Sequence, residues 1–154
     1  MKILNSGLKI FFWIILIISF DTKSDISVKE LDLKEVFKSG RSLMSLDNGL
    51  HYLEKELDIQ NVLFIGVHGS DSEGYEWIYP LITINDNQNL MSFFRYNDNL
   101  CPNRAYANLS NDINRLLDQN KNIEQVVLMG HSYGAMIIAM FSETWINEVP
   151  LTLH

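Results

Sequence analysis

A tight turn flanked by glycines, near the C-terminal end, restricts the fold of this chain more than any other feature. Residues 130–134 have the sequence Gly-His-Ser-Tyr-Gly, which fits the pattern G-x-S-x-G. An apolar run at 126–129 precedes them, and an apolar, helix-like stretch at 135–141 follows. A strand that turns this sharply into a helix strains its central serine, and a Cβ on either glycine would collide with the neighbouring strand or helix. The pattern is typical of a nucleophile elbow, so we expect the Ser132 hydroxyl to stand clear of a sheet, above a helix N-terminus that favours negative charge.

At such an elbow Ser132 is expected to act as a nucleophile toward the carbonyl carbon of an ester, amide or thioester. The alternative is a serine in an ordinary strand-to-helix turn. A serine nucleophile also needs two backbone N–H groups that point at the oxygen on which negative charge develops. One of them belongs to the residue after the nucleophile, which here is Tyr133.

The second N–H donor is expected in the loop after the first buried strand. The continuous apolar run at 62–67 indicates a strand buried on both faces, and His68, Gly69 and Ser70 follow it directly. A glycine in this loop allows the backbone to approach a reacting group closely. The Ser70 N–H is therefore the candidate donor; the alternative is that Gly69 merely turns the chain. His68 either anchors the loop through side-chain hydrogen bonds or serves as an improvised general base.

Strand-like and helix-like segments alternate along the chain. Strands are expected at 62–67, 90–96 and 126–129, with the start of another at 149–154, and helices at 75–84, 106–120 and from the elbow to about 146. The stretch 32–57 is also predicted to be helical, because its leucines recur at helical spacing, at Leu46, Leu50, Leu53 and Leu57. The alternation predicts an α/β fold with a mostly parallel sheet and helices on both of its faces.

These features resemble the α/β-hydrolase superfamily, and within it the lipase-like and esterase-like members. The resemblance covers residues 58–148 and rests on the His68-Gly69 loop, the helix that starts near Trp77, the strand that ends at 94–96, and residues 130–135. It implies a three-layer α/β/α fold that is cut short after the elbow helix. It also implies Ser132 as the nucleophile, Ser70 and Tyr133 as the donors of the oxyanion hole, and His131 as a packing residue.

The chain departs from the family pattern after the elbow. In that family an acid and then a histidine follow the serine, on loops after later strands. Here the candidates after Ser132 are Glu143, Glu148 and His154. We expect Glu143 to point along the elbow helix, away from the site, and His154 to lie too far from Ser132. The resemblance thus implies a serine hydrolase that acts on an ester-like bond through an acyl-serine, incomplete or inactive as written. The alternative is a non-catalytic, hydrolase-like scaffold or binding protein.

The N-terminal segment has the pattern of a targeting sequence. Lys2 and Lys9 supply positive charge, and residues 10–20 form an unbroken apolar run. That run has the length of a signal-peptide core and is shorter than the ~20 residues of a spanning helix. We therefore expect a signal peptide or membrane anchor at 1–24 and a partial hydrolase domain at 25–154, with a protein that is periplasmic, secreted or anchored to the membrane. The alternative is a buried N-terminal helix of the domain.

Composition excludes several classes of function. The formal net charge of −7 would repel a nucleic-acid backbone. The spacing of Gly69 and Gly74 imitates a phosphate-binding loop, but Tyr75 and Glu76 stand where lysine and a hydroxyl residue are required. Histidines and cysteines do not show metal-ligand spacing, and the single cysteine, Cys101, excludes an intrachain disulfide. We expect no nucleotide, cofactor or metal, and a small-molecule or lipid ester as the substrate.

Overall fold

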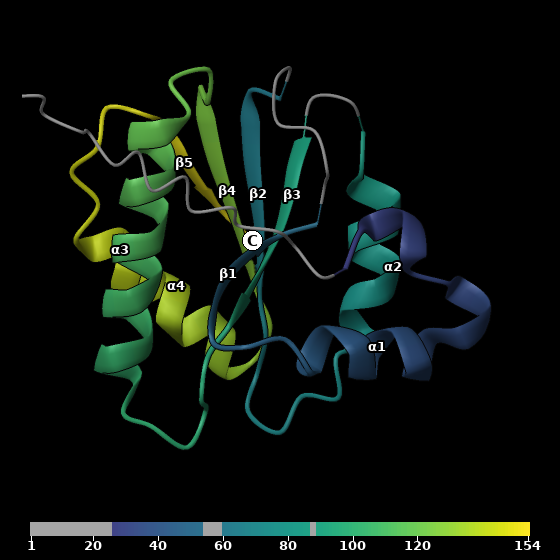
Figure 1. The fold of residues 1–154 in the computed structure, drawn as a ribbon. Coiled ribbons are helices and arrows are strands. Elements are labelled where there is room, and N and C mark those ends of the chain that lie inside the picture. Colours follow the sequence, from purple (N-terminus) through teal and green to yellow (C-terminus); the bar gives the residue numbers. More distant parts are fainter. Residues whose placement is uncertain (1–25, 54–59, 87–88) are drawn as a thin grey trace, which may run out of the picture.

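A mixed sheet runs through the middle of the molecule in the computed structural model, which describes residues 26–53, 60–86 and 89–154 (Figure 1). Within these ranges the sheet has five strands in the order β1-β3-β2-β4-β5. The strands are β1 (Gly49–Tyr52), β2 (Val62–Val67), β3 (Asn89–Arg95), β4 (Gln125–Gly130) and β5 (Leu151–Leu153). β1 runs antiparallel to β3, and the other three pairings are parallel. The predicted α/β class with a mostly parallel sheet is confirmed.

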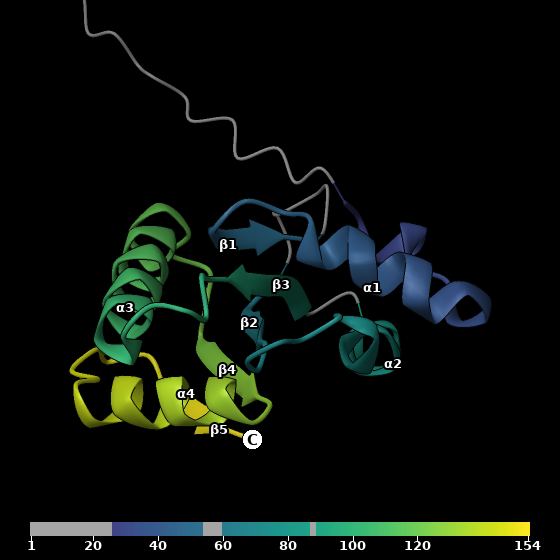
Figure 2. The same ribbon diagram turned by 90° about the horizontal axis from the view of Figure 1, so that it is seen from below.

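Helices cover both faces of the sheet (Figure 2). The helices are α1 (Val36–Met44), α2 (Tyr75–Ile84), α3 (Pro102–Gln119) and α4 (Tyr133–Glu143). α1 and α2 lie on one face, and α3 and α4 lie on the other. The side chains of each strand alternate between the two faces, so the sheet separates two apolar cores. Leu63, Ile65 and Val67 of β2 face α3 and α4, whereas Phe64 packs with residues of α1 and α2.

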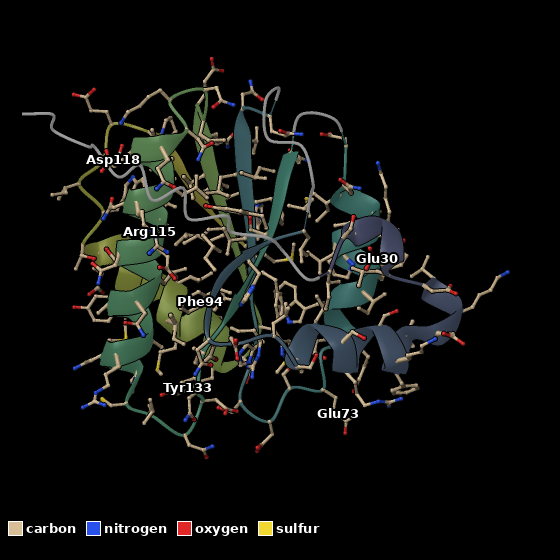
Figure 3. All side chains as sticks on the ribbon, viewed as in Figure 1. Glu30, Glu73, Phe94, Arg115, Asp118 and Tyr133 are labelled. Atoms are coloured by element: carbon tan, nitrogen blue, oxygen red, sulfur yellow. The ribbon has the colours of Figure 1, made fainter. Side chains whose placement is uncertain are left out.

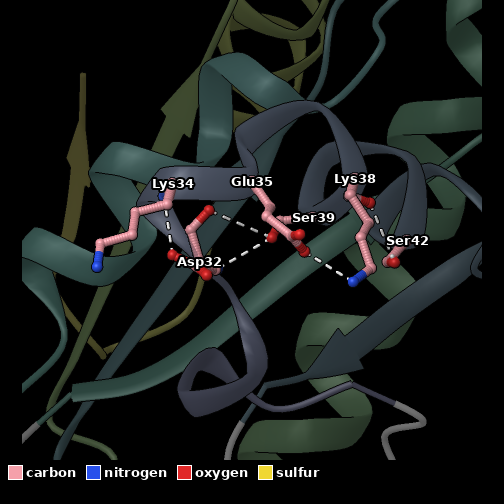
Figure 4. Close-up of polar contacts among 6 residues, drawn as sticks. All are labelled: Asp32, Lys34, Glu35, Lys38, Ser39 and Ser42. Atoms are coloured by element: carbon pink, nitrogen blue, oxygen red, sulfur yellow. Dashed lines mark hydrogen bonds and ion pairs between the residues drawn. The ribbon is translucent and has the colours of Figure 1, made fainter.

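Polar contacts fix the entry of the chain into α1 (Figure 4). Two short 3₁₀ turns, Val28–Glu30 and Leu33–Glu35, lead into the helix. An Asp32 carboxylate oxygen accepts a hydrogen bond from the Lys34 N–H at 2.8 Å, and the Asp32 N–H donates to Ser39 Oγ at 2.9 Å. Lys38 pairs with Glu35 on the surface at 2.7 Å. Exposed ion pairs of this kind add little stability. The hydrogen bonds of Asp32 therefore contribute more than the Lys38–Glu35 pair to the conformation of the chain before α1.

The prediction of one long helix over 32–57 is wrong, because α1 ends at Met44 and residues 49–52 form β1. Gly49 adopts φ 137°, which a helix does not contain, and the chain then pairs with β3 from Gly49 to Tyr52. Leu50 and Tyr52 fall on the same face of this strand, toward α3. Pairing with β3 therefore overrides a leucine spacing that is typical of a helix. Leu57 lies outside the described residues.

The other predicted elements differ from the structure mainly at their ends. The helix at 75–84 and the strand at 62–67 are confirmed, and β5 confirms a strand within 149–154. α3 begins at Pro102 rather than at 106, because proline suits the first turn of a helix, where its missing N–H leaves no bond unmade. The helix after the elbow ends at Glu143 rather than near 146.

The predicted signal peptide or anchor, residues 1–24, lies outside the described residues. In the part of the chain that the structure describes, none of the helices has both the length and the apolar character needed to cross a membrane.

Candidate active site

The candidate site lies at the carboxyl ends of β2 and β4, where the chain leaves the two strands toward opposite faces of the sheet. β2 and β4 are parallel neighbours, and their pairing ends at Val67 and Gly130. The chain leaves β2 toward α2 on one face and leaves β4 toward α4 on the opposite face. In open α/β sheets such a switch point leaves a crevice outside the carboxyl ends of the strands, where ligands bind. Tyr133, at the start of α4, and Glu73, in the loop after β2, both lie at this end of the sheet (Figure 3).

Ser132 adopts a strained backbone conformation at the turn between β4 and α4. Its φ of 53° and ψ of −117° are uncommon for a residue with a Cβ and cost roughly 1–3 kcal/mol. Ser132 occupies the N-cap position of α4, but its side chain does not cap the helix. The residue is exposed, and its hydroxyl makes no hydrogen bond to any described residue. The hydroxyl is therefore presented to solvent at a helix N-terminus, as the sequence pattern predicts.

The glycines on either side of Ser132 are required by close contacts. A Cβ on Gly130 would lie 2.6 Å from the Ala135 Cα. A Cβ on Gly134 would lie 2.2 Å from the Val67 carbonyl oxygen. Real Cβ atoms do not approach other atoms this closely, so a larger residue at either position would force the backbone to move. The predicted collision of a Cβ on either glycine with the neighbouring strand or helix is confirmed, and the structure shows that the helix is met at Gly130 and the strand at Gly134.

The loop after β2 contacts the elbow through Gly69. A Cβ on this residue would lie 3.1 Å from the Ser132 Cβ and 3.0 Å from the His131 carbonyl oxygen, so only a glycine allows the approach without displacement. Ser70 follows it and is exposed. Tyr133 is the first residue of α4, where backbone N–H groups have no intrahelical partner. The structure thus brings the loop that carries Ser70 against the turn that carries Ser132 and Tyr133.

His68 is fully buried beneath this loop and has partners for both ring nitrogens. Nδ1 lies 2.7 Å from the Gly69 carbonyl oxygen. Nε2 lies 3.3 Å from the Tyr96 backbone nitrogen and 2.7 Å from Arg95 Nη1. Both of these neighbours donate hydrogen bonds, so Nε2 accepts and the proton resides on Nδ1. Burial lowers the pKa of His68 from its ordinary value of 6.5, and the positive charge of Arg95 lowers it further.

The geometry supports the anchoring role of His68 over the role of a general base. A general base needs a free ring nitrogen within hydrogen-bond reach of the reacting proton. Both nitrogens of His68 are instead occupied by protein groups. The ring also stacks on Tyr96 with 4.1 Å between the ring centroids.

Tyr96 and Asp98, which follow β3, hold the loop after β2 in place. The Tyr96 hydroxyl donates to the His68 carbonyl oxygen at 2.6 Å. Asp71 has a positive φ of 53°, and its N–H donates to Asp98 Oδ2 at 2.6 Å. Burial raises the pKa of Tyr96, so its hydroxyl remains a donor at neutral pH. Sequence reasoning did not identify Tyr96, Asp71 or Asp98, because no motif marks a loop that is held from the next strand.

The acids and histidines after Gly130 do not hydrogen-bond to Ser132 within the described part of the chain. Glu143 is exposed near the end of α4, and Glu148 is exposed after it. The His154 N–H donates to the Leu128 carbonyl oxygen at 2.9 Å, so its backbone continues the pairing of β5 toward the elbow. His131 was expected to pack inside the elbow; its side chain is exposed, but its Nδ1 lies 3.1 Å from the position of a Cβ on Gly69, so it contacts the loop after β2 without being buried.

Neither a metal-binding cluster nor a similar known protein helps to assign a function to this site. Among the described residues, no group of three or more His, Cys, Asp or Glu side chains could hold a metal ion. Comparison of the chain with protein-family models, curated proteins and solved structures gave no match. The elbow and the loop after β2 are therefore the features from which a function can be inferred.

Proposed function

We propose that this chain is a serine hydrolase of the α/β-hydrolase type, similar to lipases and esterases, that acts on an ester-like bond through an acyl-serine at Ser132. The observation that carries the proposal is the backbone of Ser132, held at φ 53° and ψ −117° with its side chain exposed at the switch point of the sheet. Residues with strained backbone conformations cluster at active sites, ligand clamps and switch regions.

The proposed reaction uses the groups around the elbow in a defined order. Ser132 Oγ attacks the carbonyl carbon of the ester and gives its proton to solvent water, and the carbonyl oxygen becomes an oxyanion. The backbone N–H groups of Tyr133 and Ser70 donate to this oxyanion. The tetrahedral intermediate collapses, its C–O bond to the leaving group breaks, and the alkoxide takes a proton from water and departs as an alcohol. Water then hydrolyses the acyl-serine to a carboxylic acid and restores the serine. We propose a small-molecule or lipid ester as the substrate, without cofactor or metal.

The missing element is a group that accepts the proton of Ser132. No described histidine or acid hydrogen-bonds to its hydroxyl. Removing the base of a serine triad typically lowers the rate by several powers of ten, while the oxyanion hole and substrate binding retain 10³–10⁴-fold catalysis over water. We therefore propose that the described residues by themselves react slowly. This same observation favours the alternative function, a non-catalytic scaffold of the hydrolase type.

A fluorophosphonate probe tests the proposal directly. Its phosphorus atom takes the place of the carbonyl carbon: Ser132 Oγ forms a P–O bond, fluoride leaves, and the hydroxyl proton passes to solvent. We expect covalent labelling of the 154-residue chain, mapped to Ser132 by peptide mass spectrometry. Ser132→Ala should abolish it, and Ser70→Ala, which keeps the backbone N–H, should retain it. A folded chain that remains unlabelled would support the scaffold.

Residues 1–24 are proposed to direct export or to anchor the protein to a membrane, in keeping with their apolar run between 10 and 20. Cell fractionation of the full chain, followed by sequencing of its mature N-terminus, separates the two cases. A cytoplasmic product with its N-terminus intact contradicts both.

A further inference from the structure

The orientation of one peptide unit determines whether Ser70 can serve the oxyanion. The Gly69 carbonyl and the Ser70 N–H belong to the same planar trans peptide and point in opposite directions. The hydrogen bond of 2.7 Å from His68 Nδ1 to the Gly69 carbonyl oxygen therefore also fixes the direction of the Ser70 N–H. Glycine imposes the weakest restraint on its own backbone, so without this bond the peptide could turn over more easily.

The His68 ring is itself held so that it can serve as a fixed donor. The Tyr96 N–H and Arg95 Nη1 donate to Nε2, which keeps the proton on Nδ1, where it faces the Gly69 carbonyl oxygen. Stacking on Tyr96 opposes rotation of the ring. The Tyr96 hydroxyl also donates to the His68 carbonyl oxygen at 2.6 Å. If the Gly69–Ser70 peptide turned over, it would leave a buried Nδ1–H without a partner, which is unfavourable.

From these contacts we propose that His68 is a positioning residue, which holds the Ser70 N–H in the oxyanion hole through the Gly69 carbonyl oxygen. The inference rests on the proposed function, because it assigns a task to a donor of that same site. His68 acts through the peptide and does not touch the substrate. Arg95 and the Tyr96 N–H select the ring tautomer that the task requires.

Two substitutions separate this role from simple packing. The amide nitrogen of His68→Asn falls close to the position of Nδ1 and can still donate to the Gly69 carbonyl oxygen. The amide of His68→Gln reaches the position of Nε2 and can accept from the Tyr96 N–H, but it leaves the Gly69 carbonyl oxygen free. We expect His68→Gln to slow fluorophosphonate labelling of Ser132 by about 10²-fold, the typical effect of losing one oxyanion donor. His68→Asn should stay within about tenfold of the wild type.

Thermal melting of both variants provides the control for folding. The proposal requires a difference in labelling rate between variants of similar melting temperature. If both variants slow labelling by the same factor, or if the labelling rate simply follows the melting temperature, His68 is a packing residue and the proposal is overturned.

Nuclear magnetic resonance tests the proposal even if the wild-type chain proves inert toward the probe. Ring ¹⁵N shifts should show neutral His68 with its proton on Nδ1, and a proton on Nε2 would overturn the proposal. Residual dipolar couplings report the direction of the Ser70 N–H, which should be preserved in His68→Asn and changed in His68→Gln. An unlabelled wild type with these signatures would reject the hydrolase function but retain the control of the peptide by His68.

Discussion

Gly134 allows the elbow to approach the end of β2 closely. A Cβ at this position would lie 2.2 Å from the Val67 carbonyl oxygen and 2.4 Å from the His68 carbonyl oxygen. These two carbonyls lead directly into the loop that carries Ser70. The absence of a Cβ on Gly134 therefore allows the elbow and the loop after β2 to lie close together.

We expect Gly134→Ala to lower the free energy of unfolding by about 3 kcal/mol, because the added methyl group must displace backbone rather than a flexible side chain. Urea unfolding followed by circular dichroism measures the change. Met136→Ala, at an exposed position of the same helix, is the control and should change stability by less than about 0.5 kcal/mol. Equal effects of the two substitutions would contradict the close contact.

The lowered pKa of His68 makes stability depend on pH in a defined direction. Below pH 6.5 the unfolded chain protonates this histidine, whereas the native chain, with its lower pKa, does not. The free energy of unfolding should therefore fall as the pH drops from 6.5 toward the native pKa, by at most about 1.4 kcal/mol per pH unit. Arg95 opposes the added proton, whereas Asp98 favours it.

Urea unfolding at several pH values checks this dependence. His68→Gln lacks the titrating ring, so its stability should decline less steeply with acid over the same range. Parallel curves for the wild type and His68→Gln would show that other groups dominate the acid response.

At the scale of elements, residues distant in the sequence hold β1 in place. The Leu50 N–H at its start donates to Asp112 Oδ2 of α3 at 3.1 Å, across 62 positions of sequence. Asp112 Oδ1 also pairs with Arg115 at 2.8 Å. The edge strand is therefore joined both to β3 and to the helix that covers it.

Asp112→Ala should lower the free energy of unfolding by about 1–2 kcal/mol, because it leaves the Leu50 N–H without its partner. Asp118→Ala is a matched control on the same helix. Asp118 pairs with Lys121 at the same spacing but is 83% exposed, against 16% for Asp112, so its loss should cost less than about 0.5 kcal/mol. Chemical denaturation of both variants measures the difference, and equal losses would contradict a role for Asp112 in holding β1.

The sequence predicts those parts of the fold that depend on local pattern. The buried run of β2, the amphipathic helix α3 and the elbow at Ser132 follow from spacing, burial and glycine positions within short windows. β1 was not predicted, because the leucine spacing in 32–57 is helical and the strand at Gly49–Tyr52 is specified by its pairing with β3. The sequence predicted that His68 could anchor the loop through side-chain hydrogen bonds, but it did not identify the partners. These partners, Tyr96 and Arg95, lie 28 and 27 positions away and become neighbours through strand order.

At the scale of the whole molecule, the strand order leaves β5 at one edge of the described sheet. Its pairing with β4 spans Leu151 to Leu153, and Leu153 is 40% exposed. An edge strand presents unpaired N–H and C=O groups, and apolar side chains on it favour pairing with another chain. We therefore expect the protein to self-associate through β5 as its concentration rises.

Leu153→Lys should reduce this association, because a charged side chain on an edge strand opposes pairing with a second copy. Light scattering coupled to size exclusion should show the average mass shifting toward the 17.8 kDa of one chain. Met136→Lys places the same charge on α4 at a residue of similar exposure, 41% against 40%, and should leave the association unchanged. If both variants behave alike, net charge rather than the edge strand controls the assembly.

The backbone conformation of Ser132 lowers the stability of the fold, while its side chain supplies the hydroxyl of the proposed reaction. Its φ of 53° and ψ of −117° mirror a conformation that ordinary residues adopt freely, and glycine alone accepts both hands equally. Ser132→Gly should therefore be more stable than Ser132→Ala, which keeps the offending Cβ, by about 1 kcal/mol in urea unfolding. If the two variants unfold at the same denaturant concentration, a Cβ at this position does not strain the backbone. A library selected only for heat resistance would drift toward glycine here and lose the hydroxyl that we propose as the nucleophile.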